Sequence, residues 1–230
     1  MFSPSSKARL TVRDLERFPD RTLFHTIARA VCRAGCLPRK ELYESWEMAR
    51  RVRRLFRGGR VVDLAGGHGL LAQMMIILDD SSPDAVVVDK RIPPSAARLH
   101  QSIVDAWPRL SGRIEFVTDA SIGQSDGTSA TIRTTDLVVS SHACGALTDR
   151  VLELALDAGA RVAVLPCCHH LTDTAAKALT GWVDEALAID VVRAFHLQQR
   201  GYRVWTQFIP GDVTPKNRLL LGCPAPAGEP

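Results

Sequence analysis

Residues 61–69, VVDLAGGHG, combine an acid and three glycines at the point where an apolar run gives way to an amphipathic one. Glycine allows a tight turn and lets the backbone approach a ligand closely, while the amides that open the following helix point into the same space. An acid inside such a turn can accept a hydrogen bond from a ligand amino group. We therefore expect this turn to bind a nucleotide-like cofactor through Asp63, Gly66, Gly67 and Gly69.

Two more acids follow the next two apolar runs. Asp89 ends the run DAVVVD, twenty-six residues after the acid of the glycine turn, where a carboxylate can accept both hydroxyls of a ribose. Asp119 follows IEFVT and can accept from an adenine amino group, with Ile92 or Ile122 covering the ring. Ser140, at the end of a later run, completes the expected cofactor set. Three acids at three successive strand ends predict a site for S-adenosylmethionine.

A nicotinamide dinucleotide is the main alternative ligand. Its fingerprint is G-x-G-x-x-G, whereas the glycines here stand at positions 66, 67 and 69, with none where the third is required. The acid within the turn also favours S-adenosylmethionine, whose amino group needs an acceptor. A structural glycine turn without a ligand is the remaining alternative.

Histidines and cysteines gather after the fourth and fifth predicted strands, in SSHACGALTD (140–149) and LPCCHH (165–170). In open α/β sheets ligands bind outside the carboxyl ends of the strands, so these segments should face the reacting group. His142 is the candidate acid or base because imidazole titrates near neutrality, and Cys167 is a second catalytic candidate. The residues expected to contact the acceptor are Cys144, Asp149, Cys168 and His169.

The cysteines of these segments allow other interpretations. A thiolate of Cys167 or Cys168 could add covalently to the acceptor before methyl transfer. A metal could be held here instead, but the C-x-x-C spacing of ordinary zinc sites is absent, so no metal is assigned. Its four ligands would be His142, Cys144, Cys167 and His169. In the third interpretation, small side chains only let the loops pack against the sheet.

Short apolar runs alternate with amphipathic stretches along the chain, a pattern typical of βαβ units. Such units would position the residues described above. Parallel strands are expected near 60–64, 85–89, 113–117, 136–140 and 161–165. Helices are expected near 69–78, 94–106, 147–157, 172–178 and 182–200, and a hairpin at 202–209 and 218–223. The fold class is therefore Rossmann-like α/β, typical of class I methyltransferases. Its mostly parallel seven-stranded sheet has helices on both faces and a C-terminal antiparallel hairpin.

Two helical segments precede the first strand and carry most of the positive charge. Helical spacing over 23–56 breaks at 35–38, and a glycine pair ends the second helix. Residues 1–60 hold fifteen Lys/Arg against six Asp/Glu, whereas the remainder holds fourteen against nineteen. Clustered cations favour nucleic-acid phosphates through counterion release, so we expect RNA to bind near Arg50 and Arg54. A solvated helix face is the alternative.

One catalytic domain with a short extension fits a chain of 230 residues that is 46% hydrophobic and 23% charged. We divide it into a basic helical extension (1–57), a cofactor-binding domain (58–224) and a disordered tail (225–230). No apolar run reaches the ~20 residues needed to cross a bilayer. The polar start does not resemble a secretory signal, so a cytoplasmic protein without membrane contact is expected. The sequence does not determine the oligomeric state.

Several other residues are expected to be structural. The six cysteines are too few and too unevenly spread for a disulfide framework and are interpreted as reduced thiols, with Cys32 and Cys36 packing on one helix face. Glu44 either lies over the cofactor or is a solvent-exposed carboxylate. Core or helix-packing positions are expected for Trp46, Trp107, Trp182 and Trp205.

The segments DLAGGHG, SSHACGALTD and LPCCHH together resemble the methyltransferase domain of eukaryotic tRNA 2′-O-methyltransferases and of the glutathione S-transferase C-terminal-domain-containing proteins. The resemblance covers roughly residues 58–223. It implies S-adenosylmethionine binding through the glycine turn and Asp89, and a reacting side lined by the two later segments. The lining residues are His142, Cys144, Gly145, Asp149, Pro166, Cys167 and Cys168. The zinc-finger region of the tRNA enzymes and the Lys-Asp-Lys-Glu tetrad of ribose methylation are absent from this sequence, which favours a stand-alone, prokaryote-like version.

These observations support three functional hypotheses. The first is an S-adenosylmethionine-dependent methyltransferase of RNA, with tRNA as one acceptor. The second is methyl transfer to a small molecule, in which the two N-terminal helices cover an apolar pocket. The third is a cofactor-binding interaction module without catalysis, because no dedicated base can be identified. The sequence does not determine the acceptor atom.

Overall fold

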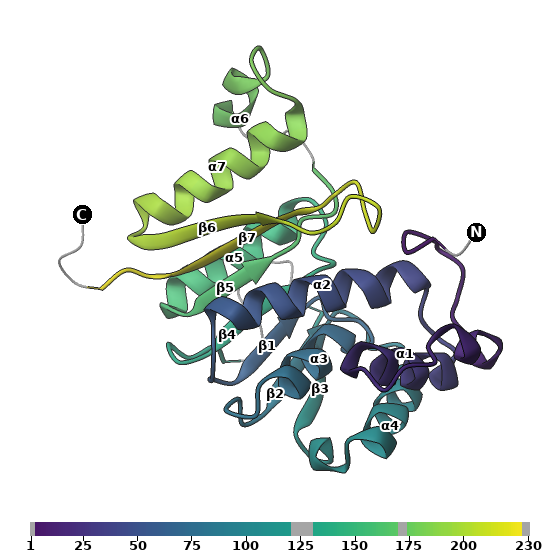
Figure 1. The fold of residues 1–230 in the computed structure, drawn as a ribbon. Helices are drawn as coiled ribbons and strands as arrows, with labels where there is room; N and C mark the ends of the chain where they lie inside the picture. The colour runs from purple at the N-terminus through teal and green to yellow at the C-terminus, as the bar shows by residue number, and fades with distance from the viewer. Residues whose placement is uncertain (1–2, 121–130, 170–173, 227–230) are drawn as a thin grey trace.

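The computed structural model describes residues 3–120, 131–169 and 174–226 and shows an α/β arrangement with helices on both faces of a sheet (Figure 1). Within these residues, seven strands form one sheet in the order β3-β2-β1-β4-β5-β7-β6. The strands are β1 (Val61–Leu64), β2 (Ala85–Asp89), β3 (Ile114–Thr118), β4 (Leu137–Ser140), β5 (Arg161–Val164), β6 (Tyr202–Phe208) and β7 (Arg218–Pro224). Strands β1 to β5 are parallel, and β7 runs antiparallel between β5 and β6. The predicted Rossmann-like fold and its terminal hairpin are confirmed.

The helices lie close to the predicted ranges. They are α1 (Leu23–Ala34), α2 (Arg39–Leu55), α3 (Leu70–Leu78), α4 (Ala96–Ala106), α5 (Ala146–Ala158), α6 (Thr174–Leu179) and α7 (Glu185–Gln199). Two short 3-10 helices, η1 (Val12–Arg17) and η2 (Pro108–Leu110), complete the described set. In the part of the chain that the structure describes, none of the helices combines the length and apolar character needed to span a bilayer.

Successive residues of the strands point into two separate cores. Val61 and Val87 belong to the larger core, which α1 to α4 cover, whereas Val62 and Val88 belong to the core beneath α5 and α7. Side chains alternate between the two faces of a strand, and here both faces are covered. The strands therefore appear in the sequence as continuous apolar runs.

The N-terminal helices share the larger core with the sheet. Ile27 of α1 and Val52 of α2 are fully buried in it. Gly35 ends α1 in the left-handed conformation, with φ 62°. The segment before α1 returns to the start of α2, where the Leu10 amide donates to the Leu37 carbonyl at 2.9 Å. The described part of the predicted extension, residues 3–57, thus packs directly against the sheet, α3 and α4.

The ends of the parallel strands define two edges of the sheet. Strands β1 to β5 end at the carboxyl edge. Strand β6 ends there too, because it is antiparallel to β7, which is itself antiparallel to β5. The start of α2, the N-terminal segment and the turn between β6 and β7 lie on one side of the molecule (Figure 1). At the amino edge, where the strands begin, lies the end of α2.

The structure corrects two packing expectations. Trp182 is 89% exposed, because the turn between α6 and α7 is closed by its own small core of Ala176, Ala188 and Ile189. Cys36 is buried but lies beyond the end of α1, so it does not share a helix face with Cys32. The other tryptophans pack against the larger core as expected; they are Trp46, Trp107 and Trp205. Ile122, predicted to cover an adenine ring, and most of the predicted tail lie outside the described residues.

Candidate functional site

The glycine turn after β1 is shaped by close packing against the neighbouring strand. A Cβ on Gly66 would lie 2.7 Å from Asp63 Cγ and 2.8 Å from Val87, so only glycine fits there. Ala65 adopts a left-handed φ of 57°, the one such non-glycine residue in the described part of the chain. A non-glycine residue in this region of φ costs energy and is concentrated at functional sites. The turn at residues 65–69 therefore combines a left-handed backbone at Ala65 with packing that requires glycine at position 66.

Asp63 is a buried acid with one oxygen unsatisfied. Its Oδ2 accepts from the Ala72 amide at 3.2 Å, whereas Oδ1 has no hydrogen-bond partner among the described residues. The pKa of Asp63 is raised to about 8, mainly by burial and in smaller part by the neighbouring acids Asp89 and Glu41, against the lowering effect of the Ala72 amide. A buried acceptor without a partner is costly. A ligand that brings an N–H donor or a positive charge to this point would relieve that cost.

Asp89 lies at the end of β2, next to the glycine turn. Its Oδ2 accepts from the Gly67 amide at 2.9 Å and its Oδ1 from the Arg91 amide at 3.0 Å. These two bonds fix the carboxylate but use only half of its acceptor capacity. A Cβ on Gly67 would meet nothing within 4 Å, so space opens beside this acid. Asp119 follows β3, and its amide donates to the Asp89 carbonyl at 2.9 Å.

Ser140 is hydrogen-bonded within the chain, and its place in the cofactor set stays a prediction. Its hydroxyl donates to the Leu64 carbonyl at 2.6 Å and accepts from the Ala143 amide at 3.3 Å. These bonds join the end of β1 to the loop after β4, and the side chain is buried. The position was predicted from its place at a strand end, but the hydroxyl is already engaged by the chain itself.

His142 faces an acid that the sequence analysis missed. Its Nε2 lies 3.9 Å from Oε1 of Glu41, a residue in the first turn of α2. Burial raises the pKa of Glu41, and the proximity of His142 opposes that rise.

Glu44, also on α2, is a candidate for covering a cofactor, because the helix before the first strand can lie over the ligand. It is instead buried, with an ion pair to Lys40 at 3.0 Å, which corrects the expectation of an exposed carboxylate.

His68, inside the glycine turn, is a second residue that the sequence analysis missed. Its Nε2 lies 2.8 Å from Ser95 Oγ. Burial lowers the pKa of His68, and the nearby charges of Arg9, His142 and Arg98 lower it further. The N-terminal segment, the loop after β4 and α4, which carry these three residues, therefore lie close to the turn. A histidine among the turn glycines was the pattern that could have identified it.

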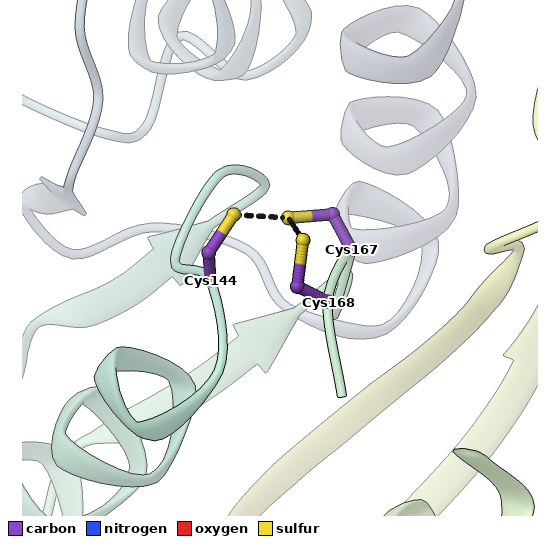
Figure 2. A group of neighbouring side chains, drawn as sticks. All are labelled: Cys144, Cys167 and Cys168. Carbon is purple, nitrogen blue, oxygen red and sulfur yellow. Dashed lines mark hydrogen bonds between the residues drawn. The ribbon is translucent and has the colours of Figure 1, made fainter. Parts of the chain in front are cut away.

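Three cysteine sulfurs converge where β4 and β5 end (Figure 2). Cys144 Sγ lies 2.8 Å from Cys167 Sγ, which lies 3.8 Å from Cys168 Sγ. Burial, followed by the two neighbouring thiols, raises the pKa of Cys167 far above its usual range. Burial also raises the pKa of Cys144. A nucleophilic cysteine needs a lowered pKa, so this environment does not favour covalent catalysis by Cys167.

Two residues predicted to contact the acceptor instead anchor the loops that carry the cysteines. Asp149 pairs with Arg193 of α7, whose Nε lies 2.6 Å from Oδ1. His169 is buried and its Nε2 lies 2.8 Å from Asp190 Oδ1, so it points toward α7. Arg218 also pairs with Asp190, at 2.6 Å. Asp149, which is about half exposed, and His169 therefore hold these loops against α7, and their contact with the acceptor stays a prediction.

The arginines predicted to bind phosphates lie at the opposite edge of the sheet. The end of α2 meets the amino edge, where Arg161 at the start of β5 donates to the Arg57 carbonyl at 2.7 Å. An α-helix rises about 1.5 Å per residue, which places Arg54 about 20 Å along α2 from Glu41. Arg54 is exposed, and Arg50 pairs with Glu47 at 3.2 Å. Binding of phosphates by Arg50 and Arg54 stays a prediction. Any phosphate that they bind would lie far from the reacting side.

Comparison with known proteins identifies the family of this chain. The model of a family described as a methyltransferase domain matches residues 41–175. A comparison with curated protein sequences returns no match. The family match begins in α2 and spans the glycine turn, the His142 loop and the cysteine loop.

Solved structures show a related fold at low sequence identity. An O-methyltransferase family protein from Burkholderia thailandensis has a TM-score of 0.50 and 18% identity, over 97% of this chain and 66% of that protein. A candidate O-methyltransferase from Nostoc punctiforme has a TM-score of 0.53 and 12% identity, over 86% and 60%. A candidate rRNA methylase from Clostridium thermocellum has a TM-score of 0.50 and 13% identity, over 76% and 92%. This chain spans less than two thirds of the first two proteins, and the three similarities concern the fold.

Proposed function

We propose, from the premise that this chain belongs to the methyltransferase domain family, that it transfers the methyl group of S-adenosylmethionine to an RNA acceptor at the carboxyl edge of its sheet. The observation that carries this proposal is the buried, unpartnered Oδ1 of Asp63 beside the glycine turn. The donor is a cationic amino acid joined to a nucleoside, and both parts need acceptors of the kind this edge offers.

The residues of the edge fit the donor. Asp63 would accept from its amino group, because Oδ1 lacks a donor among the described residues. Asp89 would accept from the ribose hydroxyls with its remaining capacity, and the space beside Gly67 leaves room for the ligand. When bound, S-adenosylmethionine supplies a methyl group already activated on a sulfonium. The chain must therefore mainly align the acceptor.

His142 is the proposed base of the reacting side. It is exposed enough to meet an acceptor, and Glu41 behind it at 3.9 Å stabilises the imidazolium that forms when a proton is taken up. General bases of this kind contribute about 10²–10⁴-fold to a rate. An acceptor hydroxyl, such as the ribose 2′-hydroxyl suggested by the resemblance to tRNA 2′-O-methyltransferases, would lose its proton to this residue.

RNA is favoured as the acceptor by the charge around the carboxyl edge. Five cationic side chains are exposed there and have no carboxylate partner among the described residues. They are Lys7, Arg9, Lys90, Arg91 and Arg98. They come from the N-terminal segment, the loop after β2 and the start of α4, which surround the glycine turn. The fold shared with a candidate rRNA methylase is consistent with this acceptor class.

A small-molecule acceptor is the second candidate. It is favoured by the return of the N-terminal segment to the start of α2, where Leu10 is fully buried and Arg9 bridges to Pro38. Such a cover restricts access to the edge and suits a compact acceptor. The folds of two O-methyltransferase proteins are also similar to this one.

The donor is tested by calorimetric titration of the purified chain with S-adenosylmethionine and with its demethylated product. We expect binding by the wild type and its loss in Asp63→Ala, with Asp105→Ala on the exposed end of α4 as the matched control. No binding by folded wild-type protein would overturn the proposal. Binding without methyl incorporation into any RNA or small-molecule pool would indicate an interaction module.

The acceptor is tested by the salt dependence of binding to bulk structured RNA. Removing one phosphate contact should reduce the slope of log K against log salt by about 0.7–0.9. We expect this reduction for Arg91→Ala, and none for Arg200→Ala, whose side chain pairs with Glu153 on α5. Affinity insensitive to salt and to Arg91→Ala would remove RNA from the proposal. Salt-independent binding of a small acceptor would favour the second candidate.

A further inference from the structure

The three cysteines at the carboxyl edge form the one group of candidate metal ligands found among the described residues. Cys144 follows β4, whereas Cys167 and Cys168 follow β5, and their sulfurs all lie within 4.8 Å of one another (Figure 2). The Gly145 amide donates to the Cys168 carbonyl at 3.2 Å, which ties the two loops together at this point. Neither the donor site nor the proposed base uses these thiols.

We propose that Cys144, Cys167 and Cys168 bind a single Zn²⁺ ion as three thiolates, with a fourth coordination position open toward the reacting side. Thiolate sulfurs are preferred ligands of Zn²⁺, which is four-coordinate and tetrahedral in proteins. Zn–S bonds of about 2.3 Å in a tetrahedron place the sulfurs about 3.8 Å apart. Cys167 and Cys168 already have this separation, and Cys144 would move outward by about 1 Å from its 2.8 Å contact.

Among the described residues the fourth position is open, because neither His142 nor His169 occupies it. His169 is turned away, with its Nε2 at 2.8 Å from Asp190. His142 has its Nε2 toward Glu41, and it does not lie within mutual reach of the three sulfurs. Cys144 is exposed and the other two thiols are partly buried, so the ion would be reached from the reacting side. Structural zinc sites are closed by four protein ligands, whereas three leave room for a water or an acceptor atom.

The framework behind the loops places the thiols before any ion binds. Arg193 is buried on α7 and donates to the Gly145 carbonyl at 3.1 Å, next to Cys144. The same guanidinium pairs with Asp149 and with Asp190. Asp190 also holds His169, the residue after Cys168. Both cysteine loops are therefore anchored to one helix, and such second contacts orient metal ligands.

A disulfide between Cys144 and Cys167 is the competing explanation for their close approach. It would leave four titratable thiols of the six cysteines in denatured, unreduced protein, whereas the proposed site leaves six once the ion is removed. The thiol count therefore separates the two explanations. It needs neither the methyl donor nor an acceptor, so the outcome does not depend on the proposed function.

The test uses the full chain, purified with a reductant that does not bind metals, stripped with a chelator, and then loaded with Zn²⁺ or Co²⁺. We expect one ion per chain by elemental analysis. The Co²⁺ form should show the visible bands of a tetrahedral centre and a thiolate charge-transfer band. The charge-transfer band should grow when 2-mercaptoethanol is added, because the added thiolate takes the open position.

Variants assign the ligands. Cys144→Ser, Cys167→Ser and Cys168→Ser should each weaken Zn²⁺ binding and reduce the charge-transfer band. Cys223→Ser, on β7, should change neither, and His142→Ala should leave the Co²⁺ spectrum unchanged. If a cysteine variant fails to fold, the wild-type Co²⁺ spectrum still reports the number of thiolates. Three results would each overturn the proposal: absence of a stoichiometric ion in reduced wild-type protein, four titratable thiols in protein purified without reductant, or retention of the ion in the triple serine variant.

Discussion

Arg53 and Asp79 form an ion pair at 3.1 Å in which both side chains are buried. The guanidinium also donates to the Met75 carbonyl at 3.0 Å and to Ser82 Oγ at 2.8 Å. Burial lowers the pKa of Arg53 to about 10, against the opposing effect of Asp79. One cation of the basic segment that ends α2 is therefore a structural element that joins α2 to the end of α3.

Arg53→Ala should lower the free energy of unfolding by about 3 kcal/mol, because it removes the buried partner of Asp79 and leaves only the longer ion pair to exposed Arg57, at 3.8 Å. The measurement is chemical denaturation followed by circular dichroism. Arg54→Ala, one residue later and exposed, should change stability by less than about 0.5 kcal/mol. Equal effects of the two changes would contradict the structural role of Arg53.

Asp63→Asn should change how stability depends on pH in the absence of the donor. The pKa of Asp63 is about 8 in the folded chain against an ordinary value of 3.8, so the folded state holds its proton more firmly. The stabilisation from this group is complete below about pH 4 and is lost as pH rises toward 8. The melting temperature of the wild type should therefore fall relative to Asp63→Asn over this window, by about 2–4 °C for each kcal/mol lost. Parallel pH profiles for the two proteins would show that Asp63 is ionised throughout.

Gly66→Ala and Gly67→Ala should separate packing from ligand binding. The first places a Cβ 2.7 Å from Asp63 and should destabilise the fold by about 3 kcal/mol. The second enters open space at φ 53° and should cost about 1–2 kcal/mol of backbone strain. We expect Gly67→Ala to stay folded but to bind the donor at least about tenfold more weakly, a loss of 1.4 kcal/mol or more. Unchanged donor affinity in folded Gly67→Ala would move the ligand away from this turn.

His142→Ala should reduce kcat by about 10²-fold or more while donor affinity is retained, since the proposed base acts on the acceptor and not on the cofactor. Glu41→Gln should reduce kcat less, because it removes only the charge that stabilises the imidazolium. His196→Ala is the matched control, because His196 of α7 pairs with Glu153 of α5 at 2.7 Å, away from the reacting side. Single-turnover rates with saturating donor check the expectation. A full rate in His142→Ala would exclude it as the base.

The carboxyl edge could be predicted because strand ends can be read directly from the sequence. Apolar runs identify strands, and parallel strands all end at the same edge, so Asp63, Asp89 and Asp119 had to meet there. The glycines of the turn follow from local sterics, since a Cβ at Gly66 collides with a side chain three residues earlier. These conclusions use only short-range geometry.

The partners of the predicted reactive residues could not be predicted from local sequence patterns. Asp149 and His169 stand in promising loops, but Arg193 and Asp190 of α7 bind them from twenty or more residues away. Glu41 approaches His142 across about a hundred residues, and Arg53 meets Asp79 on another helix. Nothing in local periodicity specifies such pairs, because they depend on how helices pack onto the sheet.

The sequence alone therefore determined the Rossmann-like fold and the acids that meet at its carboxyl edge, because hydrophobic periodicity and strand direction determine which edge each residue reaches. Only the tertiary structure decided which side chains of that edge remain available to ligands. It gave Ser140 and His169 hydrogen-bond partners within the chain, placed Arg50 and Arg54 toward the far end of α2, and brought Cys144 to Cys167 and Cys168. The physical reason is that a polar side chain binds whichever partner the packing of distant elements presents, and charge or spacing along the chain does not encode that packing.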